Sequence, residues 1–217
     1  DFDKSRVGWG VPDHVLFRKV AQRLNHNNGK PLFLTLFTVT SHHPWRVPDP
    51  DFEVSKSLKD EYSRYQNCIY YSDHSLGQLF SSLDKHVLEN SIFFITSDTA
   101  QPMGEHDNNF ALLKYLYEEN VRIPFLVYAP SLITKGEVFE EVASQVDIMP
   151  TILDFMGLKE VKSHLVGRSL LSESESEPRA YFSSSYTGNW VGIRKGPYKY
   201  FYNFKQKKHY LFNISED

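Results

Sequence analysis

The chain has 217 residues, of which 41% are hydrophobic and 15% aromatic, enough apolar material for one substantial core in one or two domains. Its formal net charge is −3 and its lysines and arginines are scattered, which excludes a nucleic-acid-binding surface because no basic stripe is present to displace counterions from phosphates. The single cysteine, Cys68, excludes an intramolecular disulfide and a cysteine-built metal site, and leaves the cellular compartment open.

The sequence has no apolar run of the length that a membrane helix needs. Its first residues, Asp1–Lys4, are neither a signal peptide nor an initiator methionine. We therefore expect that the chain is cut from a longer precursor. Whether that precursor has a membrane segment is left open.

Helical and extended patterns alternate through the first half of the chain. Apolar residues at helical spacing after Pro12 predict a helix that runs to about Asn25. The apolar and β-branched run Pro31–Thr40 predicts a strand buried on both faces. A long helix is predicted from Lys59 to about His86, with an inward stripe formed by Tyr62, Tyr65, Ile69, Leu76, Leu79 and Leu83.

The alternation continues beyond this helix. Strands are predicted at Ser91–Ser97 and Arg122–Ala129, separated by a loop and a short helix at Leu112–Tyr117. A further helix opens at Ser144 and stops at Gly157. This order predicts an α/β fold, a mostly parallel sheet flanked by helices, in which ligand sites gather at the carboxyl ends of the strands.

The last part of the chain has a different pattern. Ser172–Pro178 is a polar, charged linker or surface loop, and short strands follow it with glycine, proline and lysine in the turns. We expect a small antiparallel subdomain at residues 172–217, separate from the α/β part at 1–171. The predicted strands are Ala180–Ser185, Trp190–Arg194, Tyr198–Phe204 and Tyr210–Ile214.

Asp98 is the first candidate for chemistry, because it directly follows a predicted buried strand. Its carboxylate would lie at the carboxyl edge of the sheet, where a hard cation and an anionic ester can be held together. The alternative is an aspartate that caps a loop or the next helix.

Several motifs, taken in order, resemble the sulfatase branch of the alkaline phosphatase superfamily. They include a strand that ends in Ser-Asp followed by a Gly-Glu-His loop, and later Gly-Arg-Ser-Leu and Tyr-Leu-Phe-Asn stretches. The resemblance implies that residues 1–171 are the carboxyl-terminal portion of a sulfatase-like catalytic domain. The stretches that carry it are Ile92–His106, Arg122–Pro130, Ser144–Leu158, Gly167–Leu171 and Tyr210–Asp217, while Gly8–Gly10 and Thr38–Trp45 are similar to the lipoteichoic acid synthase and phosphoglycerol transferase branch.

The same resemblance implies a metal site at Asp98 and Thr99. In the family, the strand-terminal aspartate and the histidine after it bind a divalent metal, which could be manganese, zinc, magnesium or calcium. Thr99 stands in place of that histidine, and a threonine hydroxyl is a poor ligand where neutral imidazole is a good one. We expect metal affinity to be weakened or lost, unless water or His106 fills the gap.

Two histidines are candidate substrate contacts. The resemblance implies that His42, the first histidine of its loop, faces the substrate phosphate as an anion-binding or proton-donating group, whereas His43 is a packing or surface residue. His106 could reach the same pocket or be a surface loop histidine. Asp73-His74 repeats the family's ligand dipeptide, but adjacent helical residues point about 100° apart, so we interpret Asp73 as structural.

In the family, the nucleophile and the first metal carboxylate lie upstream of the region that this chain resembles. We therefore assign no catalytic nucleophile here and expect the chain to be inactive in isolation, with the amino-terminal half of the same domain as its partner. The expected chemistry of the whole enzyme is attack of a metal-activated hydroxyl on phosphorus, followed by transfer from a covalent intermediate.

The predicted function is part of a metal-dependent phosphoglycerol or phosphodiester transferase. Its substrate would be a lipid- or glycan-linked phosphate or sulfate ester, at the extracytoplasmic face of the cell membrane or in the periplasm, with membrane attachment through an amino-terminal region. One alternative is a sulfatase or phosphonate-ester hydrolase. Another is a degenerate, non-catalytic binding member, which Thr99 favours.

Overall fold

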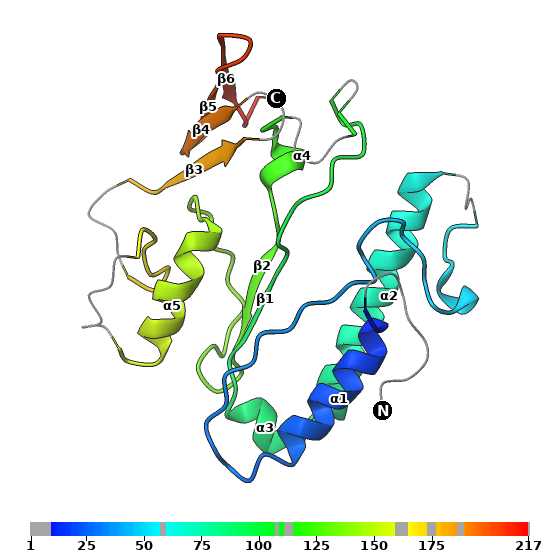
Figure 1. Cartoon of the computed structure of the whole chain (residues 1–217). Helices are drawn as coiled ribbons and strands as arrows, with labels where there is room; N and C mark the ends of the chain where they lie inside the picture. The colour runs from blue at the N-terminus through cyan, green and yellow to red at the C-terminus, as the bar shows by residue number, and fades with distance from the viewer. Residues whose placement is uncertain are drawn as a thin grey trace. The chain divides into compact units, whose positions relative to one another are not determined.

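The computed structural model describes residues 10–56, 60–106, 109–110, 115–158, 165–172, 177–185 and 189–216. Three helices and a 3₁₀ turn come first, strands and helical segments then alternate, and a run of four strands ends the order (Figure 1). The described residues divide into two compact units, one within residues 1–95 and 126–135, the other within 96–125 and 136–217. None of the helices in these described parts combines the length and apolar character that crossing a membrane requires.

The first unit is built on two helices, α1 (Asp13–Asn25) and α2 (Glu61–Ser82), which lie side by side (Figure 1). The 3₁₀ turn η1 (Pro50–Phe52) precedes α2, and the short helix α3 (Lys85–Glu89) follows it. Both long helices were predicted, although α2 ends before His86. Their shared core consists of Phe17, Val20, Ala21, Leu79 and Leu83.

The buried stripe of α2 differs from the predicted one. Tyr62 and Ile69 are exposed, so the prediction is wrong for these two residues. The hydroxyl of Ser72 donates to Asp13 Oδ2 at 2.7 Å, and the Tyr71 hydroxyl lies 2.5 Å from His14 Nδ1. These polar contacts with α1 select the face that packs, which hydrophobic spacing alone does not reveal. The buried residues of α2 are Ser63, Asn67, Cys68, Tyr71, Ser75 and Leu79.

The predicted buried strand at Pro31–Thr40 is wrong for the chain as the structure describes it. This run forms no strand, and the side chains of Phe33 and Phe37 are 66% and 78% exposed. A strand needs a neighbour for its backbone hydrogen bonds and a cover for its side chains. Within the described residues, β1 (Phe93–Thr96) and β2 (Phe125–Tyr128) pair with each other, and no strand pairs with this run.

The predicted strands at 91–97 and 122–129 are present as β1 and β2, each shorter than expected. The short helix α4 (Glu118–Val121) lies between them. The α/β composition is confirmed, but a parallel sheet is not seen among the described residues, where the sheet with a described register is antiparallel. Gly8-Trp9, Lys59, residues 112–114 of the predicted short helix and residues 173–176 of the linker lie outside the described residues.

In the second unit, the 3₁₀ turn η2 (Gln145–Asp147) leads into α5 (Ile148–Phe155). A capping box opens the turn, in which the Ser144 backbone N–H donates to Asp147 Oδ2 at 2.8 Å. Gly157 ends the helix with φ +72°, as its predicted role requires. The Gly-Arg-Ser-Leu stretch contacts this turn, since the Arg168 backbone N–H donates to Asp147 Oδ1 at 2.8 Å.

The four predicted carboxyl-terminal strands form one antiparallel sheet in the order β3-β4-β5-β6. Its buried face packs against the residues before α4 through a cluster that includes Leu116, Trp190 and Phe201. The sheet is confirmed, and a domain boundary at residue 171 stays a prediction. The strands are β3 (Arg179–Ser184), β4 (Trp190–Lys195), β5 (Tyr198–Asn203) and β6 (Lys208–Asn213).

Candidate functional site

Asp98 and Thr99 lie two and three residues after the end of β1, and both are exposed. The segment is held through its backbone, because Gln145 Nε2 donates to the carbonyl oxygens of Ser97 at 2.8 Å and Asp98 at 3.2 Å. No described residue donates a hydrogen bond to the Asp98 carboxylate. The strand end is therefore anchored to the residue that opens η2, while the Asp98 carboxylate is open to solvent.

The donor set around Asp98 does not by itself make a metal site. Among the described residues, no group of three or more histidine, cysteine, aspartate or glutamate side chains is placed to hold a metal ion. Asp98 offers a carboxylate, and Thr99 offers only a hydroxyl, which binds transition metals poorly. Any metal at this position would need ligands in addition to those that the described residues supply.

His42 lies in an exposed loop, Ser41–Trp45, in the first unit. Its Nδ1 atom lies 2.7 Å from the carbonyl oxygen of His43, and the Trp45 indole N–H donates to the carbonyl oxygen of Ser41 at 3.2 Å. Trp45 is buried and packs edge-on against Tyr65, while the His43 ring contacts Trp45. Trp45 thus holds the loop in place, so that His42 has a defined position on the surface, while His43 is exposed and contacts Trp45 with its ring.

A buried carboxylate fixes the start of this loop, and sequence reasoning missed it. Asp13 Oδ1 accepts hydrogen bonds from the Val39 N–H, the Thr40 N–H and the Thr40 hydroxyl, at 3.3, 3.2 and 2.7 Å. Asp13 is completely buried. Its position after Pro12 is typical of an acidic residue in a helix's first turn, so the sequence carried no signal of this second role.

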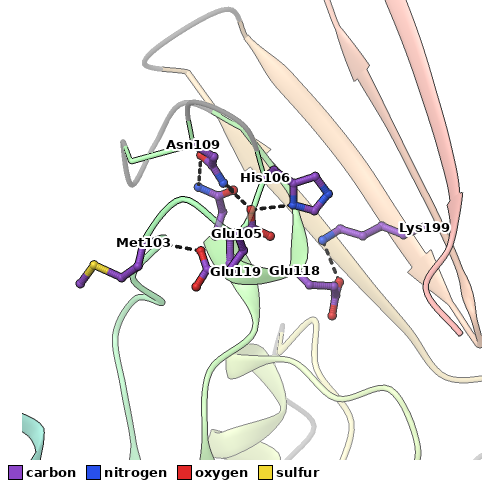
Figure 2. A network of polar contacts seen from close by, with 8 residues as sticks. Met103, Glu105, His106, Asn109, Glu118, Glu119 and Lys199 are labelled. Carbon is purple, nitrogen blue, oxygen red and sulfur yellow. Dashed lines mark hydrogen bonds and ion pairs between the residues drawn. The ribbon is translucent and has the colours of Figure 1, made fainter. Parts of the chain in front are cut away.

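His106 belongs to a polar network in the second unit that is centred on Glu119 (Figure 2). Its Nδ1 atom lies 2.7 Å from Glu119 Oε1, and its ring stacks on Tyr117 with centroids 4.0 Å apart. Asn109 Nδ2 donates to the same Glu119 oxygen at 2.7 Å and to Asn120 Oδ1 at 2.8 Å. His106 is therefore a half-buried residue whose ring is held by a hydrogen bond and by stacking, and not a histidine without contacts on the surface.

The neighbouring glutamate faces the carboxyl-terminal sheet instead. Glu118 accepts hydrogen bonds from Lys199 Nζ at 2.8 Å and from Arg194 Nη1 at 3.1 Å (Figure 2 shows the Lys199 contact). The Lys199 side chain is only 2% exposed, and this burial lowers its pKa, although the Glu118 carboxylate acts in the opposite direction. Sequence reasoning missed both residues, since nothing in a Glu-Glu pair tells which partner each will have.

The second unit holds Asp98, Thr99 and His106, whereas the first holds His42. Asp73 and His74 lie within α2, as predicted, and His74 Nε2 is 3.0 Å from Gln78 Nε2. The structure thus brings neither of them into a carboxylate and imidazole cluster that could bind a metal among the described residues.

Two family models match the chain. The model described as Sulfatase matches residues 2–158, and the model described as N-sulphoglucosamine sulphohydrolase, C-terminal, matches residues 104–217. The stretch with Asp98, Thr99 and His42 lies within the first match, and His106 lies within both.

Curated relatives and solved structures are also similar to the chain. An arylsulfatase from Clostridium perfringens is 33% identical over 61% of it, and a lipoteichoic acid synthase from Staphylococcus aureus is 27% identical over 81%. The chain spans 28% of the length of each of these relatives. A protein in the alkaline phosphatase superfamily from Vibrio parahaemolyticus matches all of the chain and 53% of its own length, with 21% identity and a TM-score of 0.71.

These matches agree with the order of motifs along the sequence. The Sulfatase model covers more than half of the residues, and the structural neighbour shares the fold over the whole chain. The chain belongs to the sulfatase family.

Proposed function

We propose that the chain is the carboxyl-terminal part of a metal-dependent phosphoglycerol or phosphodiester transferase of the sulfatase family. The observation that carries the proposal is the exposed Asp98 carboxylate two residues after the end of β1, inside the stretch matched by the Sulfatase model. The similarity to a lipoteichoic acid synthase over 81% of the chain favours a transferase that acts on a lipid- or glycan-linked phosphate. Such an enzyme would work at the extracytoplasmic face of the cell membrane or in the periplasm.

In this proposal, Asp98 is one metal ligand, Thr99 occupies the position of a second, and His42 and His106 contact the substrate. The remaining ligands and the nucleophile come from the amino-terminal half of the same domain, which also carries any membrane attachment. The exposed apolar run that includes Phe33 and Phe37 is consistent with such a partner, because it is uncovered among the described residues. The chain by itself would be inactive.

Two other functions also have observations in their favour. The 33% identity to an arylsulfatase favours a sulfatase or phosphonate-ester hydrolase, in which the same residues would face a sulfate or phosphonate group. Thr99, together with the incomplete donor set around Asp98, favours a degenerate, non-catalytic member that binds a glycan or a lipid phosphate.

Calorimetric titration of Mn²⁺ and of Zn²⁺ into the full-length protein tests the metal site. We expect weak binding, tightened by Thr99→His by at least about tenfold, and lost in Asp98→Ala. Thr96→Val is the matched control at the end of β1, since its hydroxyl bonds the Pro124 carbonyl oxygen and not the site. If neither the natural protein nor Thr99→His binds metal, the assignment of Asp98 is wrong.

Turnover separates the three functions. Phosphatidylglycerol serves as the phosphodiester substrate and an aryl sulfate as the sulfate ester. Transfer from the phospholipid supports the proposed transferase, and cleavage of the aryl sulfate alone supports the hydrolase. Absence of both reactions, with a soluble and folded protein, leaves the degenerate member as the function.

A further inference from the structure

The His106 ring is held on one edge and one face. Nδ1 is bonded to Glu119 Oε1, and the ring lies parallel to Tyr117 with an angle of 3° between the planes. The His106 side chain nevertheless remains 36% exposed, against 10% for Glu119. Nε2 makes no hydrogen bond to the described residues. It is also not buried, because the buried polar atoms without a partner in this part of the chain do not include it. The ring therefore presents Nε2 to solvent, on the side away from Glu119 (Figure 2).

The Glu119 carboxylate decides which nitrogen carries the proton. Burial acts to raise the pKa of Glu119, but hydrogen bonds from Asn109 and His106 outweigh it and the pKa is lowered. An ionised carboxylate can only accept a hydrogen bond, so the Nδ1 atom of His106 has to donate. In the neutral ring this places the proton on Nδ1 and the lone pair on Nε2.

Glu119 is itself fixed by buried groups. Asn109 is completely buried, and its amide spans Glu119 and Asn120. The loop that carries it is closed by two backbone bonds, from the Gly104 N–H to the Asn109 carbonyl and from the Asn109 N–H to the His106 carbonyl. A carboxylate and imidazole pair that is supported in this way is oriented before any ligand arrives.

We propose that Glu119 is a positioning residue that holds His106 as the Nδ1–H tautomer, and that His106 Nε2 accepts a proton from a hydroxyl group during ester transfer. The proton-transfer role rests on the proposed function, whereas the tautomer does not. In the step, the O–H bond breaks and leaves its electron pair on the oxygen, while the Nε2 lone pair forms the N–H bond. The resulting imidazolium lies against the Glu119 carboxylate, which stabilises its charge.

NMR of the full chain labelled with ¹⁵N at histidine tests the tautomer, with the His106 signals assigned through His106→Gln. Near neutral pH, we expect Nδ1 protonated and Nε2 unprotonated. Glu119→Ala removes the acceptor and should abolish this preference, while Glu119→Gln should retain it, because an amide oxygen can still accept from Nδ1. Glu118→Gln, the same change one residue earlier, should leave the His106 signals unchanged.

A proton on Nε2 in the natural chain would overturn the positioning role, and so would an unchanged tautomer in folded Glu119→Ala. If Glu119→Ala does not fold, the tautomer of the natural chain still decides. Selective broadening of the Nε2 signal by Mn²⁺ would make His106 a metal ligand and overturn its role as a proton acceptor.

The second measurement is turnover of phosphatidylglycerol by the full-length protein. We expect Glu119→Ala to lower kcat by about a hundredfold with little change in KM, and Glu118→Gln to have a much smaller effect. An equal loss in both variants indicates a structural role and overturns the proposal. If the natural protein turns over no ester while the Nδ1–H tautomer is observed, the proposed function and the proton transfer fail together and the positioning by Glu119 stands.

Discussion

The Oδ1 atom of Asp13, in the first turn of α1, lies 2.7 Å from the hydroxyl of Thr40, the residue that precedes the His42 loop. The same oxygen also accepts the backbone N–H groups of Val39 and Thr40. Because both Asp13 and Thr40 are completely buried, water cannot replace these bonds. A single carboxylate therefore sets where the His42 loop begins.

Asp13→Ala should lower the free energy of unfolding by about 2–4 kcal/mol, because it leaves the buried donors of Thr40 and the partly buried donors of Val39 and Ser72 without an acceptor. Urea unfolding followed by tryptophan fluorescence measures the change. Thr40→Val removes one donor together with its bond, and should cost only about 1 kcal/mol. Equal losses in the two variants would show that the carboxylate has no role beyond the Thr40 hydroxyl.

Gly167→Ala should destabilise the second unit strongly. A Cβ atom at this position would collide with the backbone carbonyl of Val146, and backbone cannot yield as a flexible side chain can. Gly136→Ala is the matched control, since a Cβ there meets nothing and the change should be close to neutral. Thermal unfolding of both variants gives the comparison, and a neutral Gly167→Ala contradicts the close packing at η2.

Glu118→Ala should cost roughly 3–5 kcal/mol, because it leaves the buried Lys199 ammonium without its carboxylate. Adding Lys199→Met should restore most of the loss, since methionine fills a similar volume without charge. Chemical denaturation of the single and double variants measures the coupling. If the two changes simply add, the ion pair does not carry the interaction between α4 and β5.

Cys68 should be almost inert toward alkylation in the folded chain. Burial, and after it the negative charge of Asp13, raises the pKa of the thiol from 9.0 to about 12. Below pH 9 the thiolate fraction should be about a thousandfold lower than in the unfolded chain, and iodoacetamide labelling followed by mass spectrometry measures it.

The raised pKa of Cys68 also makes the stability of the folded chain depend on pH. The folded chain favours the neutral thiol, so the contribution of the thiol to stability is fully present below pH 9 and is lost as the pH rises toward 12. Fast labelling of the folded chain below pH 9 would contradict the burial of Cys68.

The sequence predicted the elements whose stability is local or shared with near neighbours in the chain. The strands β3–β6 follow one another closely in the chain and each pairs with the next, so their pattern of polar and apolar residues was sufficient. Pro31–Thr40 had the composition of a buried strand, but a strand also depends on a neighbour and a cover that composition does not contain.

For the candidate site, the sequence predicted individual residues but not the side chains that they contact. Asp98 and His106 were predicted as site residues from their place after a strand and in a Gly-Glu-His loop, and these roles stay predictions. Their partners were not predicted, because the Glu118 and Glu119 side chains point about 100° apart around a helix, and only tertiary packing decides that one meets Lys199 and the other His106. Asp13 was missed for the same reason.

The exposed run at Pro31–Thr40 also affects how this chain will behave at high concentration. After its first proline it carries no charge and no further proline, and it is rich in residues that favour cross-strand stacking. Uncovered runs of this kind pair with copies of themselves, so this segment is where self-association of the 217-residue chain should begin. Phe37 is 78% exposed, so Phe37→Lys should raise solubility with little loss of folding stability. Light scattering over a concentration series would reveal the reduced self-association.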